Sequence, residues 1–237
     1  MKARVLGIGT MLLLLSTPTW AQLDRMLEGL SFGQKSGLSD VKVGSGLKEA
    51  LKIGTGNTVN LTGRTNGYFR NKAIKILMPK TLQRLEKPLR LVGYGPQIDD
   101  FVLSMNRAAE QAAPFAKDIF WNAIAEMSFD DAKKILAGND TAATDYFKAK
   151  TTDKLSVAFR PVVENAMNQT GVTRHYKDLV KRYEKIPFTK SMAFDIDRYV
   201  VEKSMDGLFY VLGQEEKKIR KNPAARVTNL LKEVFGS

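Results

Sequence analysis

Apolar residues recur at helical spacing along most of the chain, and no stretch shows the sustained alternation of a strand or a βαβ order. The clearest stripe runs from Ile98 to Met127, with apolar positions three and four residues apart. A second stripe follows residues 195–221, and a shorter one begins near Ser45 and runs towards Leu61. Short connections between long helices favour antiparallel neighbours, so the pattern predicts an all-α fold, an antiparallel helical bundle.

Prolines inside the apolar stripes predict that several of these helices are kinked. Pro114 should bend the 98–127 helix, because proline removes a backbone donor and clashes with the preceding turn. A helix opening at Pro79 should be kinked or ended by Pro88. Pro161 lies inside another predicted helix. The expected architecture is therefore a bundle with proline-kinked helices.

Turn and capping signals place the remaining helix ends. Ser128 followed by Asp131 is typical of a capped N-terminus, and Gly138 should end that helix. We expect further helices at about 142–150, 153–169 and 173–186, a long one over 195–221, and a last one after Asn222-Pro223 that buries Val227, Leu230, Leu231, Val234 and Phe235.

The first residues have the three parts of a secretory signal peptide. Lys2 and Arg4 form a short basic region, and an uncharged apolar run follows from Val5 to Ser16. Thr19-Trp20-Ala21 places small residues where signal cleavage requires them, so we expect cleavage before Gln22. An uncleaved membrane anchor is the alternative. The apolar run is short for a bilayer span, and export to the bacterial periplasm or secretion is therefore expected.

The chain accordingly divides into a signal peptide over 1–21, a flexible Gly- and Ser-rich arm over 22–44 and a single helical domain over 45–237. The full chain has a formal net charge of +12. Cleavage removes two bases and no acid, which leaves the mature chain at 12 − 2 = +10.

Composition excludes several kinds of site. The chain has no Cys and one His, which excludes disulfides, thiol nucleophiles, cysteine zinc sites and His-rich metal sites. We therefore expect no metal and no cofactor. Hydrophobic residues make up 43% and charged residues 26% of the chain, which is typical of a globular protein rather than a disordered one.

A basic segment over residues 64–90 is the strongest functional signal. It has eight bases and one acid, Glu86, so its charge is 8 − 1 = +7, whereas residues 97–145 have four bases and nine acids, 4 − 9 = −5. The segment is expected to meet an anionic surface: lipid headgroups, lipopolysaccharide or glycans. Its candidate anion-binding residues are Lys72, Lys75, Lys80, Arg84 and Lys87. The alternative is that these bases pair with the acidic region. Export argues against nucleic acid as the partner.

Two further arginines are candidate anion ligands. Arg107 lies three residues before Glu110 on a helix, so it either binds an anion or forms a structural ion pair. Arg226 lies in the first turn of the last helix, where a cation is unfavourable unless a carboxylate such as Glu215 or Glu216 compensates it.

The paired carboxylates Asp195 with Asp197 and Glu202 with Asp206 are candidates for an acid and a base. Glu202 and Asp206 repel each other at i, i+4, so a basic partner elsewhere is expected. The single His175 stands among bases without a nucleophile beside it. We assign no catalytic residue.

Several ungapped blocks, in order, resemble a bacterial family known as domain of unknown function 4197. The blocks are Gly46-Leu47-Lys48-Glu49-Ala50-Leu51, Met105-Asn106-Arg107-Ala108-Ala109-Glu110 with Ala112-Ala113-Pro114, Ala142-Ala143-Thr144 with Tyr146-Phe147, and Asp206-Gly207-Leu208-Phe209 followed by Glu215-Glu216, Ile219-Arg220 and Asn222-Pro223-Ala224-Ala225-Arg226. They span about residues 45–236. The resemblance implies an exported helical protein and implies no activity.

Together these features predict a non-enzymatic binding or envelope-associated module. The alternatives are a carboxylate-based hydrolase of envelope polymers and a carrier of an apolar ligand held within the bundle. A cleft with two acids would favour the hydrolase. An apolar pocket would favour the carrier. A basic face with neither feature would favour the binding module.

Overall fold

The structure is a computed structural model that describes residues 43–171, 173–177 and 194–222, all within one compact unit, Val43–Ser237. Every regular element among these residues is helical, which confirms the all-α fold class. The last helix and its candidate Arg226, the signal peptide and most of the arm lie outside the described residues, as does most of the helix expected over 173–186.

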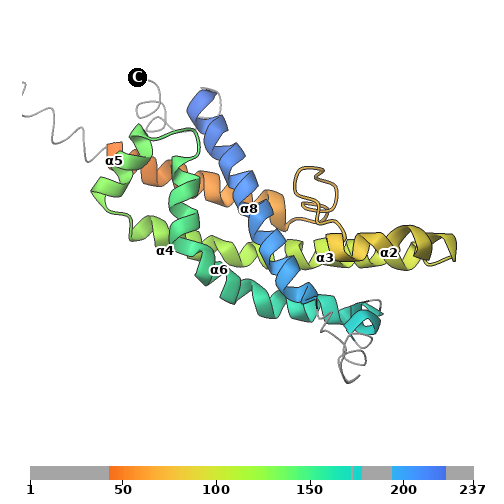
Figure 1. The fold of residues 1–237 in the computed structure, drawn as a ribbon. Coiled ribbons are helices and arrows are strands. Elements are labelled where there is room, and N and C mark those ends of the chain that lie inside the picture. Colours follow the sequence, from red (N-terminus) through yellow and green to blue (C-terminus); the bar gives the residue numbers. More distant parts are fainter. Residues whose placement is uncertain (1–42, 172, 178–193, 223–237) are drawn as a thin grey trace, which may run out of the picture. The chain divides into compact units, whose positions relative to one another are not determined.

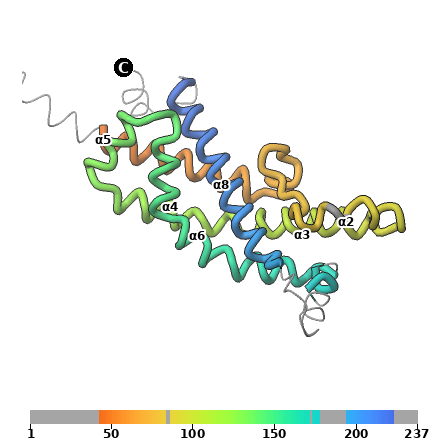
Figure 2. Tube along the Cα trace, in the orientation of Figure 1, coloured from red at the N-terminus to blue at the C-terminus, as the bar shows by residue number. Residues whose placement is uncertain are grey.

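The first described helix spans 43–63 and is followed by the turn-rich connection 64–79. The labelled helices are α2 (Lys80–Leu91), α3 (Gly95–Ala112), the 3-10 turn η1 (Ala113–Phe115), α4 (Ala116–Ala125), α5 (Phe129–Ala137), α6 (Ala142–Gln169) and α8 (Ile196–Lys221). Figure 1 and Figure 2 show α8 crossing α3 and α6 within this arrangement.

Several helix boundaries follow the sequence signals. Pro114 lies in the 3-10 turn that separates α3 from α4. The Ser128 hydroxyl accepts a hydrogen bond from the Asp131 amide, and the Asp131 carboxylate accepts one from the Ser128 amide. This reciprocal capping box confirms the predicted start of α5.

The predicted break near residue 151 is wrong, because α6 runs without interruption from 142 to 169. The hydroxyls of Thr151 and Thr152 donate to the carbonyls four residues earlier, at 2.6 and 2.7 Å, so these polar side chains are satisfied inside the helix. Thr151 also lies between Phe147 and Leu155 on a fully buried face. That continuous apolar face outweighs the weak helix preference of two threonines.

The core lies where α3, α6 and α8 pack together, and the predicted stripes supply it. Met105 of α3 and Leu208 of α8 are completely buried. Phe120 packs edge-to-face on Phe147, with 5.1 Å between the ring centroids. Among the described helices none is both long and apolar enough to cross a membrane.

Candidate anion-binding surface

The basic connection 64–79 is fastened to α3 by the side chain of Asn106. Its Oδ1 accepts from the Ile76 amide at 2.9 Å, and its Nδ2 donates to the Ile76 carbonyl at 2.8 Å. Asn106 is completely buried, so these bonds form away from water. One buried amide side chain therefore pairs both backbone groups of Ile76 and holds this part of the connection in place.

A buried carboxylate fixes the other end of the connection. One oxygen of Glu110 accepts from the amides of Tyr68 and Phe69, each at 3.1 Å. The other oxygen pairs with Arg107 at 2.5 Å, and Arg107 also donates to Asn66 Oδ1 at 3.0 Å. Glu110 is 4% exposed, so its charge is compensated almost entirely by these donors.

Two glycines allow the connection to pack this closely. A Cβ at Gly67 would lie 2.5 Å from the carbonyl oxygens of Leu61 and Thr62. A Cβ at Gly207 of α8 would lie 2.5 Å from the ring of Tyr68. The Tyr68 hydroxyl donates to the Ser204 carbonyl at 2.6 Å, and burial raises the pKa of Tyr68 far above its usual range.

The fastened connection and α2 present most of their bases to solvent. Lys72, Lys80 and Lys87 are exposed, and among the described residues no carboxylate forms an ion pair with any of them. Lys75 is half-buried, with its ammonium 4.3 Å from the centre of the Phe69 ring. Arg84 belongs to α2. The structure thus brings the candidate residues onto one connection and one helix.

Arg90 fits the alternative in which basic and acidic regions pair. Its guanidinium contacts Glu86 at 3.1 Å and Asp99 at 2.6 Å. Hydrogen bonding to Asp99 and then to Glu86 raises the pKa of Arg90, and the same bond to Arg90 holds the pKa of Asp99 below its usual range. Pairing therefore explains Arg90 but leaves Lys72, Lys80 and Lys87 unaccounted for.

Arg107 forms the i, i+3 pair with Glu110 that its spacing predicts, and its side chain is still 34% exposed. Its guanidinium lies 6.0 Å from the Phe69 ring, so Lys75 and Arg107 both approach the same aromatic ring. The structural role of Arg107 is thus visible. Its role as an anion ligand remains a prediction.

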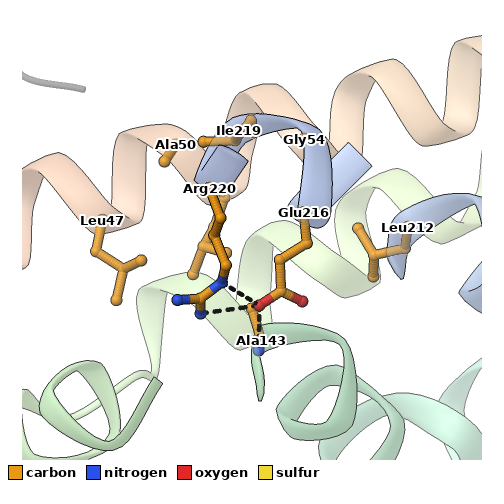
Figure 3. Close-up of a pocket in the computed structure, with 9 residues that line it drawn as sticks. Leu47, Ala50, Gly54, Ala143, Leu212, Glu216, Ile219 and Arg220 are labelled. Atoms are coloured by element: carbon orange, nitrogen blue, oxygen red, sulfur yellow. Dashed lines mark hydrogen bonds and ion pairs between the residues drawn. The ribbon is translucent and has the colours of Figure 1, made fainter. Parts of the chain in front are cut away.

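Glu216, the expected partner of Arg226, has a different role among the described residues. Figure 3 shows its carboxylate between Arg220 and Ala143. It accepts from the amides of Ala143 and Thr144 at 2.9 and 2.8 Å, and from the Thr144 hydroxyl at 2.8 Å. The N-cap Thr141 makes no side-chain capping bond, so Glu216 of α8 caps α6 from a distance.

A small pocket lies beside this carboxylate, lined mainly by apolar side chains from the first helix and α8 (Figure 3). Leu47, Gly54, Leu212 and Ile219 are among its lining residues. Neither Pro114 nor Pro161, the prolines within the predicted helices, is among its lining residues. The sequence did not reveal Glu216 as a cap, because its carboxylate lies more than 70 residues along the chain from the amides that donate to it.

The other candidate carboxylates are engaged in local pairs. Asp195 caps α8 through the Arg198 amide, and Asp197 pairs with Lys177 at 2.5 Å. Among the described residues, the second pair has basic partners on its own helix and not elsewhere: Arg198 lies 2.8 Å from Glu202, and Lys203 lies 2.7 Å from Asp206. Within the described part of the chain, no group of three or more His, Cys, Asp or Glu could hold a metal ion.

A family model with the description "Protein of unknown function (DUF4197)" matches residues 37–236. No curated protein and no solved structure matches the chain.

Proposed function

The chain belongs to the DUF4197 family, and from that premise we propose that it is an exported, non-enzymatic module that binds anionic surfaces of the bacterial envelope through its 64–90 segment. The partners of this chemistry are lipid headgroups, lipopolysaccharide or other polyanionic glycans. Recognition is Coulombic and tolerant of the partner's detailed structure, because lysine ammonium groups displace counterions from whatever anions they meet.

One observation carries this proposal: Lys72 on the fastened connection and Lys80 and Lys87 on the adjoining α2 are exposed, without a carboxylate partner among the described residues. If their only role were solubility, the chain would not need to fasten the connection through buried Asn106 and Glu110. Fixing the connection reduces the conformational entropy that its side chains would lose on meeting a surface. The signal-peptide pattern at the N-terminus supports the envelope as the location.

The two alternative functions, a carboxylate-based hydrolase and a carrier of an apolar ligand, receive weaker support. The candidate acids of α8 are each held by a base or a backbone amide, which suits structural pairing better than acid–base chemistry. The pocket beside Glu216 exposes only apolar atoms, but it has room for little more than one water molecule, which is too little for a carried apolar ligand.

Co-sedimentation with vesicles of phosphatidylcholine and phosphatidylglycerol tests the proposal. The test variant changes Lys72, Lys75, Lys80 and Lys87 to Gln. The matched control changes four exposed lysines elsewhere to Gln: Lys52, Lys117, Lys148 and Lys150. Both variants lose four charges, so net charge is the same and only the position differs.

Wild type and the control should sediment with anionic vesicles at low salt, whereas the test variant should remain in solution. A lysine near an anionic membrane contributes about 1 kcal/mol, so four of them account for up to about a thousandfold in affinity. Equal binding by the two variants would contradict a dedicated surface, and no binding by wild type would contradict the function itself.

A further inference from the structure

The turn between α2 and α3 exposes an unusual group of large apolar side chains. Leu91 is 87% exposed, Val92 68% and Tyr94 53%, and Leu89, two residues before Leu91, is 38% exposed. Single exposed apolar residues are common, but consecutive ones at the end of a hairpin form a patch that water solvates poorly.

This turn lies at the end of the α2–α3 hairpin, and α3 is the main neighbour of α2 among the labelled helices (Figure 1). The Arg90–Asp99 ion pair ties the two helices together close to the turn. Figure 2 traces the hairpin with its turn at the end remote from α8. The apolar side chains are therefore held on a defined projection rather than on a free loop.

The backbone of the turn satisfies its own donors. The amide of Val92 donates to the Pro88 carbonyl at 3.3 Å, that of Gly93 to Arg90 at 3.2 Å, and that of Tyr94 to Leu89 at 2.9 Å. Gly93 adopts φ +92°, which a glycine accepts without strain. These three amides would therefore keep their hydrogen-bond partners if the turn left water.

We propose that Leu91, Val92 and Tyr94 insert into the interfacial region of an anionic phospholipid bilayer, while Lys87 lies at the headgroups. This inference rests on the proposed function and adds to it a second, apolar contact with the membrane. Lys87 is four residues before Leu91, so the two share a helix face. Tyrosine is favoured at this depth because its ring is apolar and its hydroxyl reaches water.

Charge favours a lipid surface over a second copy of the chain as the occupant. Residues 80–100 have four bases and three acids, and the preceding connection 64–79 adds four bases and no acid. A second copy of this segment carries the same excess of bases and so offers it no complementary charge. An anionic bilayer instead attracts them, and apolar insertion supplements that attraction as in interfacial helices.

Site-specific fluorescence tests insertion directly, because the chain has no native cysteine. Val92→Cys is labelled with an environment-sensitive fluorophore. Val157→Cys is the matched control, since it is also an exposed valine, 75% exposed, on α6. Both labelled full-length proteins are mixed with vesicles of phosphatidylcholine and phosphatidylglycerol, with and without a quencher attached to the lipid chains.

We expect the label at position 92 to shift to the blue and to be quenched from within the bilayer, and the label at 157 to do neither. A label at 92 that stays in water while the protein sediments with vesicles would overturn insertion and leave the proposed function standing. If the protein does not sediment at all, both fail. A blue shift at position 92 that grows with protein concentration in the absence of vesicles would show that the turn contacts a second copy of the chain. That result would overturn the proposed insertion into lipid.

The unlabelled double variant Leu91→Ser with Val92→Ser provides a second measurement. Each side chain that leaves water supplies on the order of tenfold in affinity, so the variant should bind anionic vesicles about a hundredfold more weakly. Its residual binding should still respond to salt. Affinity equal to that of wild type would overturn the inference.

Discussion

At the residue scale, two buried carboxylates hold distant segments together by accepting hydrogen bonds from backbone amides. Glu110 holds the amides of Tyr68 and Phe69, and Glu216 holds those of Ala143 and Thr144. Each carboxylate also pairs with an arginine of its own helix. Spacing along the helix predicts the Arg107–Glu110 pair. Because backbone amides leave no signature in sequence, the remote donors could not be foreseen.

Replacing Glu110 with Ala should therefore lower the free energy of unfolding by about 2–4 kcal/mol. The change leaves the buried amide of Tyr68 and the partly buried amide of Phe69 without their acceptor, and it removes the ion-pair partner of Arg107. Urea denaturation measures the effect. Glu164→Ala is the control, because Glu164 is 44% exposed and lies 3.9 Å from Arg160, a contact worth under about 1 kcal/mol. Equal losses in the two variants would show that Glu110 does not fasten the connection.

The buried side chain of Tyr68 should make the folded state less stable at alkaline pH. An unfolded tyrosine has a pKa of about 10, and burial raises that of Tyr68 well above this value. Above about pH 10 the folded state thus retains a proton that the unfolded state releases, so stability falls as pH rises. Tyr68→Phe has no such proton, and its free energy of unfolding should fall less between pH 9 and pH 12 than that of wild type.

The other tyrosines with raised pKa values, Tyr146, Tyr176 and Tyr199, remain in both proteins and cancel in the comparison. At neutral pH Tyr68→Phe should cost about 1 kcal/mol through the lost bond to Ser204. Parallel pH curves for the two proteins would contradict the assignment.

At the element scale, apolar periodicity and capping predict most of the described helices. The stripes of α3 and α8 are buried as expected, and the start of α5 is correct to the residue because its capping box is local. The break predicted within α6 is wrong, since the decisive term there is burial against other helices and not the local preference of Thr151 and Thr152. The close approach of the 64–79 connection to α8 has no local signature either.

Glycine substitutions in α8 test that close approach. Gly207→Ala should destabilise the protein by about 1–3 kcal/mol, because the new methyl group would lie 2.5 Å from the ring of Tyr68 and 3.1 Å from Cβ of Ile74. Gly213→Ala is the matched control in the same helix. Its nearest neighbour is 3.6 Å away, so the gain in helix propensity, about 1 kcal/mol, should be retained. Thermal unfolding distinguishes the two, and a stabilised Gly207→Ala variant would show that Tyr68 does not pack there.

At the scale of the whole molecule, the sequence indicates the basic segment, and the structure shows which of its bases are already paired. Arg90 is engaged by Glu86 and Asp99, whereas Lys72, Lys80 and Lys87 are exposed. Sequence reasoning could not make this distinction, since every base contributes equally to a count of charge. It also overlooked the apolar turn at Leu91 and Val92, because two apolar residues at a helix end resemble core residues until their exposure is known.

Cleavage of the signal peptide also concerns the whole molecule. The mature protein should begin at Gln22, because Thr19 and Ala21 meet the small-residue requirement for signal cleavage. N-terminal sequencing of the protein recovered from the periplasm of an expressing bacterium measures this. An intact Met1 on exported protein would show that the segment is an uncleaved anchor.

The salt dependence of membrane affinity tests the central claim most directly. The dissociation constant for anionic vesicles is measured from 0.05 to 1 M salt for wild type and for the variant with Lys72, Lys75, Lys80 and Lys87 changed to Gln. Screening shortens the Debye length from about 10 Å at 0.1 M to about 3 Å at 1 M, so wild-type affinity should fall steeply. The variant should bind weakly throughout, with a much shallower slope. Wild-type affinity that is independent of salt, or equal slopes for the two proteins, would contradict a Coulombic surface at this segment.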